Sequence, residues 1–265
     1  MLTSAQIDHF RTFGSVALPN FLDALRATAL RDEVDPAIRD AYGTTYDERV
    51  IDDISGHYLP MASRLTPLSA SLISDDAVLI DAAEQLLGTG VLPSVPERVL
   101  YFADAGWHDG GIGAHGVKVA TFDELDGANG ALRFVPCSHH PDGRPHLRAY
   151  QRASYEEVPG VIVGSCPGDL VAFDLHTFHA AYGGRDRLVW TTVYVDNPGD
   201  ESSRERALRW MTDALEQGFR GFDRARYPVW RYWLTNPDSL HRRAAVIEGL
   251  GAAGVLGVAG AELGW

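Results

Sequence analysis

The sequence predicts a mainly β protein, built as an antiparallel sandwich or jelly roll with helices at both ends. Six short apolar runs between Arg98 and Asp196 have the length and composition of strands, and glycine, proline and aspartate separate them. Six runs in about 100 residues favour antiparallel pairing over alternating β and α units. Helical patterns precede Arg98 and follow Glu201. No linker divides these parts, so we expect residues 1–265 to form a single domain.

The helical segments at the two ends are predicted from caps and apolar spacing. Ser4 can cap a short helix that ends near Gly14, and the run SVALP after it has the composition of a short strand. Residues 21–42 follow with a helical pattern. After Glu201, leucine and methionine recur at helical spacing, and a further helix is expected to begin at Ser239. The strand-rich region therefore lies between two helical regions of the chain.

The six strand segments are short, rich in β-branched and aromatic residues, and bounded by turn residues. They are RVLYFAD (98–104), GVKVATFD (116–123), GALRFVP (130–136), VIVGS (161–165), GDLVAFD (168–174) and RLVWTTVYVD (187–196). We expect them to form the β core.

Composition and charge narrow the classes of partner. The 265 residues include 23 basic and 36 acidic residues, for a formal net charge of −13, which argues against a nucleic-acid-binding protein. The two cysteines, Cys137 and Cys166, do not make a disulfide framework. No signal peptide is visible, and the uncharged residues 250–261 are too few and too rich in glycine to span a membrane. We therefore expect a cytoplasmic protein that binds a small molecule and neither nucleic acid nor membranes.

Two histidines at strand ends are the candidate metal ligands. His108 closes a strand and enters a glycine-rich turn in the stretch WHDGG, and His179 lies just beyond the strand DLVAFD. A non-haem iron(II) site typically uses two imidazoles and one carboxylate and leaves positions open for substrate and oxygen. Strand ends of a jelly roll can supply such groups, because the two sheets converge on one pocket. Their placement therefore makes this pair the candidate iron site.

Four stretches resemble the phytanoyl-CoA dioxygenase-like branch of the iron- and 2-oxoglutarate-dependent oxygenases. They are LTSAQIDHFRTFGSVALPNFL, GWHDGG, GVKVATFDELDGANGALRFVPCSHH and GDLVAFDLHTFHAAYGGRDRLVWTTVYVD, of which NGALRFVPCSH is the most specific. The resemblance implies a double-stranded β-helix (a cupin-like jelly roll), Fe(II), 2-oxoglutarate and O2. It also implies that His108 and His179 bind iron, with His176 as the competing choice for the second ligand. Arg187 best matches the arginine that binds the distal carboxylate of 2-oxoglutarate, and Arg185 is the reserve.

The stretch WHDGG departs from the family pattern, in which the carboxylate ligand lies two residues after the first histidine. Residues i and i+2 of an extended segment project to one face, and here position i+2 is Gly110. In a first reading Gly110 leaves room for chloride or another halide, as in relatives with glycine or alanine there, which are halogenases. In a second reading Asp109 reaches iron through a bulge and the enzyme is a hydroxylase. In a third the protein binds a small molecule without turnover.

Further residues give clues to the substrate. The stretch SHHPDGRPHLR gathers His139, His140, Arg144 and Arg148 in an otherwise acidic chain, and this positive cluster would suit a carboxylate or a phosphate, including that of a nucleotide. Trp107 is a candidate for stacking on a substrate ring. Asp109, where it does not bind iron, is a candidate contact for a substrate amine or hydroxyl, or a residue that orders the surroundings of His108. The sequence thus favours halogenation of a small anionic metabolite in specialised metabolism.

Overall fold

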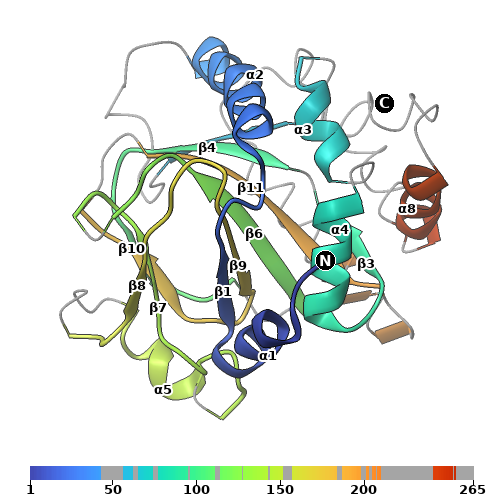
Figure 1. The fold of residues 1–265 in the computed structure, drawn as a ribbon. Coiled ribbons are helices and arrows are strands. Elements are labelled where there is room, and N and C mark those ends of the chain that lie inside the picture. The colour runs from blue at the N-terminus through green and yellow to red at the C-terminus, as the bar shows by residue number, and fades with distance from the viewer. Residues whose placement is uncertain are drawn as a thin grey trace.

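Two antiparallel sheets form the centre of the molecule (Figure 1). The computed structural model describes residues 1–42, 56–61, 65–73, 77–94, 96–110, 114–126, 128–142, 144–151, 157–183, 187–197, 201–202, 205–206, 208–209, 241–252 and 254. Within them, the larger sheet has the strand order β1 (Ser15–Leu18), β9 (Leu170–Asp174), β6 (Gly116–Phe122), β11 (Arg187–Asp196), β4 (Glu97–Tyr101) and β2 (Gly56–Pro60), and β3 (Val91–Pro93) also pairs with β11. The smaller sheet has the order β5 (Ala105–His108), β10 (His179–Ala181), β7 (Leu132–Phe134) and β8 (Val161–Val163).

Helices pack mainly on the outer side of the larger sheet (Figure 1). They are α1 (Ser4–Phe13), α2 (Ala24–Tyr42), α3 (Pro67–Leu72), α4 (Ala77–Leu87) and α8 (His241–Ala252), while the short α5 (Arg144–Arg148) lies near the smaller sheet. The described residues include no helix with the length and apolarity that crossing a membrane requires.

Strand β11 lies between the cavity on one face and the helical layer on the other. Arg187, Val189 and Thr191 line a cavity between the sheets. Trp190 and Tyr194, on the opposite face, hydrogen-bond to Ser69 and to the Ile73 carbonyl near α3. Because successive side chains point to opposite faces of a strand, β11 is covered on both sides, by the cavity and by the helical layer.

The first helix differs slightly from the sequence expectation. Thr3, not Ser4, is the N-cap: its hydroxyl accepts a hydrogen bond from the Gln6 backbone N–H, and the Gln6 side-chain oxygen accepts one from the Thr3 backbone N–H. This is a capping box, which satisfies two backbone donors at once. The helix ends at Gly14, as predicted, in the left-handed conformation with φ +84°.

The mainly β jelly-roll class with flanking helices is confirmed, and each of the six predicted strand segments contains a strand. The strand predicted from SVALP is β1. Four further strands, β2, β3, β5 and β10, were not among the six predicted segments, although His108 closes a strand, β5, as expected. β5 and β10 carry the candidate metal ligands. Of the helical expectations after Glu201, α8 is present, whereas most of residues 203–240 lie outside the described residues.

Candidate active site

The two candidate metal ligands lie side by side. His108 ends β5 and His179 begins β10, and the two residues are directly opposite each other across the antiparallel pair. The centroids of their rings are 4.2 Å apart. The pairing of two short strands thus brings together imidazoles that are 71 residues apart in the chain, as the difference between positions 179 and 108 shows.

Hydrogen bonds to backbone carbonyls fix the tautomer and the orientation of both rings. Nδ1 of His108 lies 2.7 Å from the Gly106 carbonyl oxygen, and Nδ1 of His179 lies 2.8 Å from that of Thr177. A carbonyl can only accept a hydrogen bond, so each Nδ1 carries the proton and each Nε2 keeps its lone pair for a metal. Burial lowers the pKa of His108, and burial together with the neighbouring His108 holds the pKa of His179 well below its ordinary value. Both rings are therefore neutral near pH 7, as metal ligation requires.

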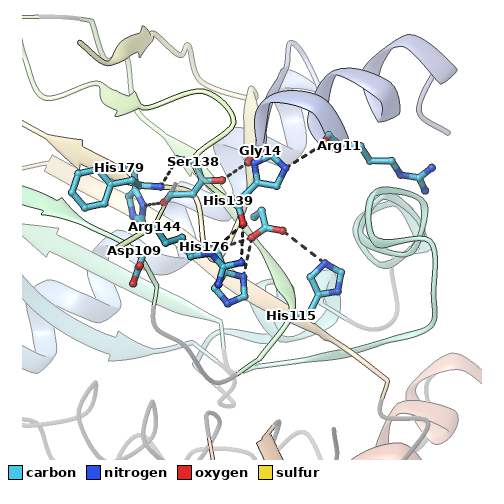
Figure 2. Close-up of polar contacts among 12 residues, drawn as sticks. Arg11, Gly14, Asp109, His115, Ser138, His139, Arg144, His176 and His179 are labelled. Atoms are coloured by element: carbon cyan, nitrogen blue, oxygen red, sulfur yellow. Dashed lines mark hydrogen bonds and ion pairs between the residues drawn. The ribbon is translucent and has the colours of Figure 1, made fainter. Parts of the chain in front are cut away.

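A tightly bonded turn between β9 and β10 positions His179 (Figure 2). The Asp174 carboxylate accepts a hydrogen bond of 2.8 Å from the His176 backbone, as in an Asx turn. The Thr177 hydroxyl donates to the Gly14 carbonyl at 2.8 Å, and the Phe178 backbone donates to the Ser138 hydroxyl at 2.8 Å. The turn is thus held both by the end of α1 and by the segment after β7.

Gly110 connects the two histidine segments. Its backbone N–H donates to the Leu175 carbonyl oxygen at 2.6 Å, and a Cβ added at Gly110 would lie 2.8 Å from that same oxygen. Any other residue would have to push the turn before His179 away. The close approach gives a packing reason for glycine at this position, beside the room for an anion that the sequence suggested.

Asp109 is bound to an arginine of α5. One of its carboxylate oxygens, Oδ2, accepts hydrogen bonds from two nitrogens of Arg148, at 3.1 and 3.3 Å. The Asp109 side chain is only 9% exposed, so this ion pair is largely shielded on the carboxylate side. Within the part of the chain that the structure describes, no three histidine, cysteine or acidic side chains are grouped to hold a metal.

The cavity between the sheets contains both imidazoles and two cationic side chains. Its walls are Tyr101, Ala105, His108, Lys118, Ala120, Phe122, Leu132, Phe173, His179, Ala180, Ala181, Arg187, Val189 and Thr191. Lys118 and Tyr101 were not among the predicted site residues. The available signal for Lys118 was its position as the one charged residue within the apolar run GVKVATF, where positions 118, 120 and 122 share a face.

Arg187 is a buried cation with spare hydrogen-bonding capacity. It is 4% exposed, donates to the carbonyls of Gly130 and Ala103 at 3.2 and 3.1 Å, and lies over the Tyr101 ring at 4.8 Å. Its Nε is buried, and no described residue accepts a hydrogen bond from it. Burial lowers the pKa of Arg187, yet an arginine stays charged near pH 7. An unsatisfied cation in the same cavity as two neutral imidazoles fits a dicarboxylate bound beside iron(II).

The residues predicted to contact the substrate, Trp107, His139, His140 and Arg144, contact other residues of the protein. Trp107 is 1% exposed and stacks on Phe178, with centroids 5.5 Å apart, so it is a packing residue outside the cavity wall. Arg144 donates to the His139 carbonyl at 2.7 and 3.2 Å. The His139 and His140 rings lie 4.1 Å apart.

Two residues were alternatives to the preferred site residues: His176 in place of His179, and Arg185 in place of Arg187. The ring of His176 lies 3.3 Å from the Asp174 carboxylate and is absent from the cavity wall, which favours His179 as the partner of His108. Arg185, the reserve for Arg187, lies outside the described residues.

The chain matches known proteins at the level of family and fold. Residues 101–186, which include both histidines, match the phytanoyl-CoA dioxygenase family model. No curated protein matches the chain. Among solved structures, the carbocyclase SnoK from nogalamycin biosynthesis is 21% identical with a TM-score of 0.59, and covers 74% of this chain and 85% of its own.

Two further structures contain ligands. The epimerase SnoN in complex with Fe3+, α-ketoglutarate and nogalamycin RO is 19% identical with a TM-score of 0.60, and the match covers 83% of this chain and 92% of SnoN. HygX from Streptomyces hygroscopicus, with nickel and 2-oxoglutarate bound, is 15% identical with a TM-score of 0.59, and the match covers 74% of this chain and 88% of HygX. Residues 101–186 thus resemble the phytanoyl-CoA dioxygenase family, and the chain shares its fold with these solved structures.

Proposed function

We propose that this protein is an iron(II)- and 2-oxoglutarate-dependent halogenase that acts on an unactivated C–H bond of a small anionic metabolite. The observation that carries the proposal is the pairing of His108 and His179, beside which the described residues group no carboxylate for a metal. The nearest sequence candidate, Asp109, is bound to Arg148. A site with only two protein ligands leaves one more position for an exogenous anion than a site with three.

Each residue has a defined role in this proposal. His108 and His179 would hold iron(II) through Nε2, since their Nδ1–H groups are bound to carbonyls. Gly110 occupies the place of the absent carboxylate. Arg187 would bind the distal carboxylate of 2-oxoglutarate, and the charge-assisted hydrogen bonds would engage its unpartnered Nε–H. Bound iron, with 2-oxoglutarate and O2, would supply the oxidant for C–H cleavage, and the halide would be the group transferred to carbon.

The structure offers less support for the hydroxylase reading. Asp109 would have to leave two hydrogen bonds to Arg148 before its carboxylate could reach a metal held by its neighbour His108. The substrate class rests on the small-molecule complex of SnoN and on the basic residues of the segment 139–148. Of those residues, Arg148 already neutralises Asp109, which leaves the charge of Arg144 to attract an anionic group.

Crystals loaded with iron(II) and 2-oxoglutarate and soaked in bromide test the proposal directly. An anomalous bromine peak next to iron is expected, and a protein carboxylate oxygen bonded to the metal would refute the two-ligand site. Succinate formation from 2-oxoglutarate in the presence of chloride separates an enzyme from a protein that only binds.

Two substitutions at Gly110 sharpen the test. Gly110→Ala adds the Cβ that approaches the Leu175 carbonyl but no carboxylate, whereas Gly110→Asp adds both. If the room at this position serves a halide, Gly110→Asp abolishes bromide binding and Gly110→Ala keeps part of it. Equal loss in both variants would mean that glycine is needed only for packing against Leu175.

A further inference from the structure

Lys118 is a charged side chain inside the cavity that the proposed mechanism does not yet use. It lies on β6 with Ala120 and Phe122, and all three line the cavity, whereas Val117 and Val119 are buried in the core behind the sheet. The position in the strand therefore fixes the direction of the side chain. Lys118 is half-buried, and an anion in the cavity would be attracted by its charge.

Lys118 lies at the metal end of the cavity. Its partner across β6 and β9 is Phe173, whose ring centroid is 4.7 Å from that of His179. Its partner on β11 is Val193, six residues from Arg187, which corresponds to roughly 20 Å along the strand at 3.3 Å per residue. Lys118 and Arg187 thus enter the same cavity from well-separated positions of the larger sheet.

The charges of the described residues around the cavity leave a positive excess. Lys118 and Arg187 are positive, and Glu97 on β4, which lies opposite Thr191 of the cavity wall and interacts with Lys118, is negative. Asp109 also acts on His108, but it is paired with Arg148, so this pair adds no net charge. Burial raises the pKa of Glu97, and protonation of this carboxyl would only increase the excess. Asp104, which acts on Arg187, is exposed, so its charge is screened by water.

The bound co-substrate does not remove this excess. Iron(II) and the 2-oxoglutarate dianion cancel, and the imidazoles are neutral, so the loaded cavity keeps one positive charge. In a site with a carboxylate ligand, a side chain of the protein would supply the negative charge that neutralises this excess. In this chain the described residues place no such carboxylate beside the two imidazoles, and a monoanion is the ligand that would balance the charge.

We propose that Lys118 binds the halide, its ammonium supplying the counter-charge for the anion that takes the place of the protein carboxylate at the metal. This inference rests on the proposed halogenase function and names the residue that gives the site its affinity for an anion.

The experiment measures halide binding without turnover. Cobalt(II) replaces iron, 2-oxoglutarate is present, and bromide is titrated while the visible absorption of the metal is recorded. Lys118→Met removes the charge at similar length, Lys118→Arg retains it, and Glu97→Gln removes the opposing charge. We expect bromide to bind about tenfold more weakly or worse to Lys118→Met, nearly normally to Lys118→Arg, and more tightly to Glu97→Gln, as the sign of each charge change requires.

Three outcomes would overturn the assignment of Lys118. The first is unchanged bromide affinity in Lys118→Met while wild type responds to bromide. The second is weakening of 2-oxoglutarate binding in that variant by the same factor in the absence of halide, which would make Lys118 a co-substrate anchor. The third is equal loss in Lys118→Arg and Lys118→Met with unchanged thermal unfolding, which would assign a steric role. A wild-type protein that shows no response to bromide would instead refute the proposed function itself.

Discussion

Replacement of Asp109 by alanine separates the two enzyme readings, because Asp109 is a metal ligand in one and the partner of Arg148 in the other. In the structure the Asp109 carboxylate accepts hydrogen bonds at 3.1 and 3.3 Å from Arg148 on α5. We therefore expect Asp109→Ala to bind iron(II) within about threefold of wild type, and to lose stability where β5 meets α5.

The size of the stability loss follows from the exposure of the two partners. The Arg148 side chain is 36% exposed and that of Asp109 is 9% exposed, so solvent screens the pair on one side only. A pair of this kind is worth about 1 kcal/mol after the discount for screening. Asp109→Ala should therefore lower Tm by about 2–4 °C in a protein of this size. Arg148→Met should cost more, about 2 kcal/mol, because it leaves a mostly buried carboxylate without its arginine.

The assay combines thermal unfolding with a competition for iron(II) against a chromophoric chelator. The double variant Asp109→Ala with Arg148→Met completes a thermodynamic cycle, in which a coupling free energy of about 1 kcal/mol is expected. The reasoning fails if folded Asp109→Ala loses iron(II) affinity by about 100-fold or more, or if the cycle gives no coupling.

Three further predictions concern the co-substrate, the turn and the core. Arg187→Met should weaken 2-oxoglutarate binding by about 100-fold by calorimetry, through the loss of charge-assisted hydrogen bonds, and normal binding would exclude Arg187 as the anchor. Burial alone would raise the pKa of Asp174, but hydrogen bonds from His176 outweigh it and lower the pKa. The resulting stability is present above about pH 4 and is lost as the pH falls through the lowered value, so the difference in Tm between wild type and Asp174→Asn should shrink below that pH. Trp107→Ala should cost about 3–5 kcal/mol of unfolding free energy with unchanged metal affinity, and a change in substrate KM without loss of stability would contradict its packing role.

The strands that could be predicted from the sequence are those with enough apolar residues to show a pattern. β6, β9 and β11 lie within runs of β-branched and aromatic residues, and they form the centre of the larger sheet. β5 and β10 have the sequences AGWH and HAA, which contain too few such residues to indicate a strand. β5 is a strand because it pairs with β10, and β10 pairs with both β5 and β7. These pairings are long-range contacts that no local pattern contains.

The sequence alone determined the jelly-roll class, the candidate histidines and the glycine two residues after His108, because apolar spacing and short motifs are local properties of the chain. Only the tertiary structure decided that His108 lies opposite His179, that Asp109 is bound to Arg148, and that Lys118 points into the same cavity as Arg187. Each of these facts depends on strand register and side-chain direction, which are set when distant segments compete to bury their apolar faces.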